Sequence, residues 1–193
     1  MVKTQTQAKL TMTQPKSNEK AHRPLPTSST CFLCGEHNPF GLKVVFWKDG
    51  DRVFTEYNVD ERRVGFDGLM HGGVLAALLD ETMGWAAAFA FDRMCITAEI
   101  TVRYVKPVSV GSTIIVSAKP VSCSRRLCVA KGEVCDVDGT LYTRASGKFL
   151  PLSIEQTRQI DSALIYPEGE ESVFNLPPEE STPATTSDGR AER

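Results

Sequence analysis

Apolar and polar residues alternate over several segments in the middle of the chain, and a period of two predicts β-strands. In the clearest segment, 96–104, every even position is apolar, which predicts a strand with one buried and one solvated face. The first two predicted strands are joined by a turn with the Asp-Gly pair that is typical of hairpins. In all, about six strands are expected, enough for one sheet; besides 96–104 they are 42–47, 52–59, 112–121, 126–135 and 141–150.

One segment, from about Gly72 to about Ala90, has the length of a long helix. It is apolar nearly all round, whereas a surface helix presents a polar face, so we expect the helix to be buried. Since strands precede and follow it, we predict an α+β fold in which one antiparallel sheet curls around a single central helix. A shorter, peripheral helix is predicted at 154–165, and a turn at 31–41.

The composition changes towards both ends of the chain. Residues 1–27 are rich in Thr, Gln, Lys and Pro, and residues 167–193 are rich in Glu, Ser, Thr and Pro. Segments of this kind lack the apolar residues that build a core, so we expect a disordered leader and a disordered acidic tail. A single domain of residues 28–166 remains between them.

Charge and cysteine content narrow the class of protein. A net charge of -2 over 193 residues argues against nucleic acid as a partner. The chain starts without the apolar run of a secretory signal, so six cysteines fit a reducing, cytoplasmic location. Asp80 and Glu81 interrupt the longest apolar stretch, and we therefore expect no membrane association.

Asp80 follows six apolar residues in the helix that we expect to be buried. Burying an ionised carboxylate without partners costs several kcal/mol, so its presence needs an explanation. Two interpretations stay open: a general base or nucleophile whose pKa the apolar wall raises, and a structural acid with a partner. Glu81 lies about 100° further round the helix. We assign it to the solvent or to an interface, where it extends one polar strip with Thr82.

The triplet His71-Gly72-Gly73 precedes the helix. Free N–H groups and the positive dipole end of a helix start can bind a developing oxyanion, and glycines let a ligand approach the backbone. The alternative is a simple loop with His71 as the capping residue. Gly72 and Asp80 lie about 12 Å apart along one helix. If both act on one carbonyl, Asp80 must come from the antiparallel helix of a second subunit, which predicts a two-fold dimer.

These residues carry a family resemblance. The sequence of 68–81, GLMHGGVLAALLDE, resembles the PaaI-like (4-hydroxybenzoyl-CoA thioesterase type) acyl-CoA thioesterases of the hotdog superfamily, including the interval from His71 to Asp80. Two further stretches are similar to that family: 31–42 with its pattern CxxCGxxNPxGL, and 97–108 together with Gly111. The resemblance covers roughly residues 31 to 150 and implies the hotdog fold.

The resemblance implies hydrolysis of acyl-CoA by a homodimer, or by a dimer of dimers, without a cofactor. The N–H of Gly72, with His71 and Gly73 beside it, polarises the thioester carbonyl in this scheme. Asp80 of the partner acts as a base on water or as a nucleophile. Thr97 matches a strand position where relatives carry a hydroxyl that orients the water; its alternative role is an ordinary sheet residue.

One position departs from the family. Relatives often carry Asn or Gln six residues before the His, where the amide helps to hold the substrate, and this chain has Gly65. The departure keeps a second hypothesis open, a hotdog module that binds or senses acyl-CoA without hydrolysing it. A hotdog dehydratase is a weaker alternative, because its pattern of a His and an acid with a following Pro is absent.

Other side chains are candidates for holding the substrate. Basic residues at strand ends suit the phosphates of CoA, and aromatic residues suit an acyl pocket, although solvated charges and core packing are the ordinary alternatives. The candidates are Lys106, Arg125 and Arg126 for the phosphates, and Phe66, Trp85 and Phe89 for the acyl group.

Cys31-x-x-Cys34 with His37 raises the question of a zinc site. Structural zinc usually has four ligands close together, and the sequence has no second Cys-x-x-Cys pair. The sequence therefore predicts no metal site, and in the resembling family this stretch is a turn before the first strand.

Overall fold

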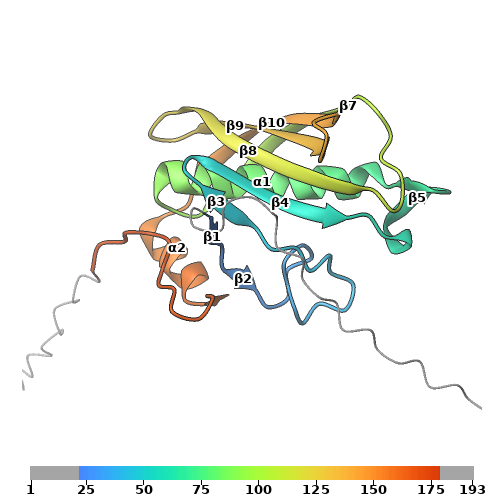
Figure 1. The fold of residues 1–193 in the computed structure, drawn as a ribbon. Helices are drawn as coiled ribbons and strands as arrows, with labels where there is room; N and C mark the ends of the chain where they lie inside the picture. Colours follow the sequence, from blue (N-terminus) through green and yellow to red (C-terminus); the bar gives the residue numbers. More distant parts are fainter. Residues whose placement is uncertain (1–21, 179–193) are drawn as a thin grey trace, which may run out of the picture.

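The computed structural model describes residues 22–178, which have the predicted α+β architecture (Figure 1). An antiparallel sheet of seven strands, in the order β1-β3-β4-β8-β9-β10-β7, packs around one long helix, α1. Its strands are β1 (Arg23–Pro24), β3 (Trp47–Asp49), β4 (Arg52–Asn58), β7 (Cys95–Tyr104), β8 (Thr113–Cys123), β9 (Cys128–Asp136) and β10 (Leu141–Pro151). The other elements are β2 (Thr27–Ser28), η1 (Glu61–Arg63), β5 (Val64–Phe66), β6 (Leu69–Met70), α1 (Gly72–Phe91), α2 (Ile154–Asp161) and β11 (Leu164–Ile165).

The helix α1 lies in the curve of the sheet (Figure 1). Its buried residues are mostly apolar and come from several sides of the helix. Leu78, Leu79 and Met83 have no exposed surface. By length and composition α1 would pass as a membrane-spanning helix, but 50% of its most apolar window is buried inside the protein, as in a core helix. The prediction of a long central helix is confirmed.

The predicted hairpin and the three later strands are confirmed with small shifts of their ends. A turn containing Gly50, whose φ of 58° suits glycine, joins β3 to β4. The first strand starts at Trp47 and not at residue 42, although Leu42 and Val44 are buried without belonging to a strand. The apolar residues at 42–46 therefore reflect packing on the core and not a β-strand. The helix predicted at 154–165 ends at Asp161.

The strand β7 forms one edge of the sheet and pairs with β10. Its predicted buried face is only partly buried: Ile100 and Val102 pack against the core, but Ile96 is 53% exposed and Tyr104 is 51% exposed. A β-bulge interrupts the pairing, since Glu99 lies opposite Lys148 and Thr97 opposite Phe149, which leaves Ala98 without a partner. The extra residue reverses the alternation of faces along the strand.

The folded body extends beyond both expected boundaries. Arg23 and Pro24 form β1 of the main sheet, and Thr27 and Ser28 pair with β11. Towards the other end, Phe174 is buried and stacks on Trp85. The boundaries at residues 28 and 166 are therefore too narrow, because short segments without apolar periodicity dock on the core by single side chains and backbone pairing. The rest of the predicted tails, 1–21 and 179–193, lies outside the described residues.

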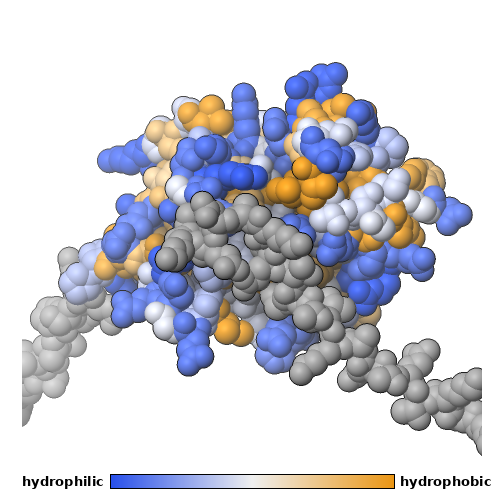
Figure 2. Space-filling view, in the orientation of Figure 1, coloured by the Kyte–Doolittle hydropathy of each residue, from blue (hydrophilic) through white to orange (hydrophobic). Residues whose placement is uncertain are grey.

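Hydrophobic patches lie among hydrophilic side chains on the face of the molecule drawn in Figure 2. Three exposed apolar residues gather where α1 begins and β7 ends: Phe66, Tyr104 and Val105. Exposed apolar residues beside an edge strand are a common feature of interfaces between protein chains.

Cys123 and Cys128 face each other on β8 and β9 and form a disulfide bond. Cys31, Cys34, Cys95 and Cys135 are free thiols. The cytoplasmic location remains a prediction.

Candidate active site

A cavity of about 270 Å³ lies beside the middle of α1, between this helix, the start of β7 and the segments that flank β2 and α2. Its wall is largely apolar, and a few polar groups converge on it, as in many small-molecule sites. The lining residues that matter for the chemistry are Cys34, Asp80, Glu81, Trp85, Cys95 and Thr97.

Asp80 and Thr97 form the best-defined polar pair in this cavity. The Thr97 hydroxyl donates a hydrogen bond of 2.8 Å to Asp80 Oδ1. The simple alternation of β7 would turn Thr97 away from Ile100, but the bulge at Ala98 turns its hydroxyl towards the helix. The structure therefore brings the two predicted catalytic residues together, one from α1 and one from the edge strand.

Glu81 corrects an expectation from the sequence. It was assigned to the solvent or an interface, but its side chain is largely buried and lines the same cavity as Asp80. Burial raises the pKa of Glu81 to about 7, with a further increase from the negative charges of Cys31 and Asp80, while a hydrogen bond with Trp85 lowers it. Asp80 and Glu81 point in directions about 100° apart on the helix, but both line the cavity. Glu81 is buried because segments outside the sheet cover its side of α1.

The start of α1 has the geometry of a capped helix. His71 is the N-cap residue, and its Nδ1 accepts a hydrogen bond of 2.9 Å from the Gly73 N–H. The capping role considered for His71 is thus confirmed, and the Gly73 N–H is occupied. The first N–H groups of a helix have no acceptor within it, so the Gly72 N–H has no partner within α1. The Tyr104 hydroxyl donates to the Gly72 carbonyl at 2.8 Å and anchors this turn, a contact that the sequence did not predict.

The structure explains why residue 65 is glycine. A Cβ atom on Gly65 would lie 3.0 Å from His71 Cδ2 and 3.2 Å from His71 Cα. The hairpin of β5 and β6 therefore packs directly on the N-cap of α1 and leaves little space for a side chain. A side chain at this position would require His71 to shift by a few tenths of an ångström.

The predicted site residues fall into two groups at different places along α1. Gly72 and Asp80 belong to the same helix, eight positions apart and thus about 12 Å. Lys106 directly follows the end of β7 whose Tyr104 contacts Gly72. The turn with Arg125 and Arg126 lies at the other end of the sheet, near Thr97. Phe149 on β10 pairs with Thr97 on one side and with Cys128, just after this turn, on the other.

The aromatic candidates also separate. Trp85 lines the cavity and stacks on Phe89 with ring centroids 5.9 Å apart. Phe66 is 81% exposed, so it does not line this cavity within one chain. Only Trp85 is therefore placed to contact a ligand beside Asp80.

Fold and site together define a hotdog domain of the thioesterase type. Residues 67–143, which run from the β5–β6 hairpin into β10, match the family model of the thioesterase superfamily. This match over part of the chain is with the superfamily that the sequence resembles, and it confirms that resemblance.

Curated proteins and solved structures that are similar to this chain are also thioesterases by name. The chain is 26% identical over 129 residues to the acyl-coenzyme A thioesterase THEM4 of Bos taurus, a match covering 65% of this chain and 53% of that protein. It thus spans about half the length of the curated relatives it matches. A crystal structure of a thioesterase superfamily protein aligns with a TM-score of 0.59 at 25% identity, covering 63% of this chain and 60% of that one.

The fold is also that of the E. coli PaaI protein from the phenylacetic acid degradation operon. The two align with a TM-score of 0.54 at 17% identity, over 58% of this chain and 81% of that one. This likeness concerns the fold and confirms the predicted hotdog architecture.

Proposed function

We propose that this protein hydrolyses acyl-CoA thioesters to a free acid and CoA. The observation that carries the proposal is the position of Asp80, a carboxylate on a buried helix that faces an apolar cavity and accepts a hydrogen bond from Thr97. A carboxylate held in this way suits a group that must activate water or attack a carbonyl. The match to the thioesterase superfamily and the acyl-CoA thioesterase relatives support the same reaction.

Each active site is proposed to combine two subunits. The Gly72 N–H of one protomer polarises the thioester carbonyl, and Asp80 of the other delivers the nucleophile. The 12 Å along α1 supports this division, because one chain cannot bring both groups to the same carbon. The exposed edge of β7, with Tyr104 and Ile96, supports a homodimer built through that edge.

The reaction ends with the thiol of CoA as the leaving group. When Asp80 acts as a base, it takes a proton from water, the hydroxide adds to the carbonyl carbon, and the C–S bond then breaks. When it acts as a nucleophile, an anhydride forms first and water cleaves it afterwards. In both routes the negative charge develops on the carbonyl oxygen, where the free Gly72 N–H stabilises it.

A dimer also offers an arrangement for the substrate-binding residues. Lys106 lies at the Gly72 end of the sheet and Arg125 and Arg126 at the Thr97 end, so antiparallel subunits bring one group of each chain near the same site. These cations would bind the phosphates of CoA. Trp85 would contact the acyl group in the cavity.

The second candidate function is binding of acyl-CoA without turnover. The glycine at position 65 favours it, because this chain lacks the amide that relatives often carry there and because the backbone of Gly65 packs closely on His71. Both hypotheses predict binding of CoA esters, and they differ only in the release of thiol.

A thiol-release assay separates the two functions. Wild type and Asp80→Asn are compared on short, medium, long and aryl acyl-CoAs with a thiol reagent. The proposal predicts turnover by wild type and a loss of about 1,000-fold in the variant, since a positioned acid or base contributes about that much. Wild type that binds the esters but releases thiol no faster than Asp80→Asn is the result that supports the binding module.

A further inference from the structure

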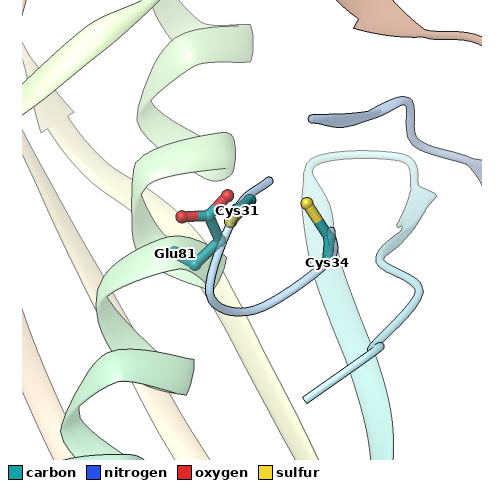
Figure 3. Close-up of side chains that lie close together, drawn as sticks. All are labelled: Cys31, Cys34 and Glu81. Atoms are coloured by element: carbon teal, nitrogen blue, oxygen red, sulfur yellow. The ribbon is translucent and has the colours of Figure 1, made fainter. Parts of the chain in front are cut away.

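Cys31, Cys34 and Glu81 bring three metal-ligating side chains together beside the cavity (Figure 3). Their two sulfur atoms and one carboxylate oxygen all lie within 4.8 Å of one another. Two thiolates on a tetrahedral zinc ion, with Zn–S bonds of about 2.3 Å, stand about 3.8 Å apart. Shifts of about 1 Å therefore suffice to place all three atoms around one ion.

The backbone of the turn that carries the two cysteines donates a hydrogen bond to each sulfur atom. The Leu33 N–H donates to Cys31 Sγ at 3.3 Å, and the Ser28 N–H donates to Cys34 Sγ at 3.5 Å. A Cβ on Gly35 would lie 2.5 Å from backbone atoms of Cys31, so the turn requires glycine after the second cysteine. N–H donors to sulfur favour the thiolate, the form that ligates a metal. At Cys34 the hydrogen bond with Cys31 and burial outweigh this effect and raise the pKa, so the ion must displace the Cys34 proton when it binds.

Glu81 reaches this turn from α1 and faces the cysteines (Figure 3). Between residues 22 and 178, no ion pair compensates its carboxylate. Its ionisable neighbours are Cys31 and Asp80, which also carry negative charge when deprotonated. Grouping such side chains away from water is unfavourable unless a cation joins them.

We propose that Cys31, Cys34 and Glu81 bind a divalent metal ion of the zinc class. Two soft thiolates select zinc over magnesium or calcium, and three protein ligands leave a fourth coordination position. Cys34 and Glu81 both line the cavity, so the ion would lie at its wall. The ion would tie the 31–41 turn to α1 and fix this wall of the cavity.

This proposal replaces the expectation that the cysteine pair binds no metal. A second Cys-x-x-Cys pair is absent from the sequence, but the missing ligand comes from the central helix. The proposal is independent of thioester hydrolysis, since it concerns the binding of an ion and requires no turnover.

Metal content is the first test. The full chain is produced in zinc-supplemented medium, purified with a reductant and without chelator, and analysed for metal by mass spectrometry. Wild type should hold about one zinc ion per chain, and Cys34→Ser and Glu81→Gln at least about 10-fold less. Cys135→Ser is the matched control, because Cys135 is a free thiol on β9 outside the cluster, and it should retain the ion.

A titration of wild type alone covers the case in which the variants do not fold. Chelator-treated, reduced protein is titrated with Co²⁺, and a thiolate-to-metal charge-transfer band should saturate at about one equivalent. Zinc should also raise the unfolding temperature, because it binds the folded chain. Reduced wild type with less than about 0.1 zinc per chain and no such band would overturn the proposal. A folded Cys34→Ser variant that keeps the full metal content would do the same.

Discussion

The first turn of α1 and its middle carry different groups for the proposed reaction. At the start, two glycines and a capping histidine leave a backbone N–H without a partner within α1, and the first turn contains no acidic residue. In the middle, Asp80 faces an apolar cavity and is held by Thr97. The first turn has a backbone donor but no acid. The middle of the helix has an acid, but its backbone N–H groups are used within the helix. The comparison teaches that the proposed site, which uses both groups on one carbonyl, needs two copies of the helix.

Removing the N–H donor at the start of α1 should reduce activity more than the two changes described after it. Gly72→Pro deletes the N–H at the first helical position, where proline fits the backbone. We expect kcat to fall about 100-fold, the usual loss for one oxyanion donor. Gly72→Ala is the matched control, since its Cβ meets the same Tyr104 ring at 3.3 Å but the N–H remains. Equal losses in the two variants would show that crowding, and not the donor, is responsible.

Removing the hydroxyl beside Asp80 tests the other part. Thr97→Val keeps the shape of the side chain and deletes the 2.8 Å hydrogen bond to the carboxylate. A hydrogen bond to a charged group is worth about 2 kcal/mol, so we expect kcat/KM to fall about 30-fold. Thr97→Ser should retain most of the activity. Full activity in Thr97→Val would show that Thr97 is an ordinary sheet residue without a role in the reaction.

The smallest expected effect is on stability. The pKa of Glu81 is raised from 4.5 to about 7, so the folded, metal-free chain holds a proton that the unfolded chain releases. Stability from this proton is present below about pH 4.5 and is lost as the pH rises through about 7. Urea unfolding of chelator-treated protein should therefore show a free energy that declines across this range, and Glu81→Gln should remove that part of the decline. An unchanged slope in the variant would assign the dependence to other groups.

Much of the fold follows from local patterns. The all-apolar helix, the alternating strands and the Asp-Gly turn each depend on near neighbours in the sequence, and the structure has all three. Asp80 and Thr97 were both predicted as candidates through the resemblance, but the hydrogen bond between them was not predicted. What failed depends on contacts between distant segments. The bulge at Ala98 has no local signal, and it decides which way Thr97 points.

Burial by segments far away in the sequence explains the other differences. Glu81 looks like a surface residue because it follows another acid, but segments around β2 and α2 enclose that side of α1. The docking of Phe174 on Trp85 likewise gives no periodic pattern, so the end of the folded body was placed too early. The grouping of Cys31 and Cys34 with Glu81 joins a turn to a helix, so a search for cysteine spacing alone does not find it.

Mixing two inactive variants tests the shared site most directly. Gly72→Pro and Asp80→Asn chains are unfolded together, refolded at equal amounts and assayed for release of thiol from acyl-CoA. Random pairing makes about half of the dimers mixed, and each mixed dimer has one intact site, so about a quarter of the wild-type activity should return. If the mixture forms dimers but stays as inactive as either variant alone, Gly72 and Asp80 do not act across subunits and the two-subunit site is wrong.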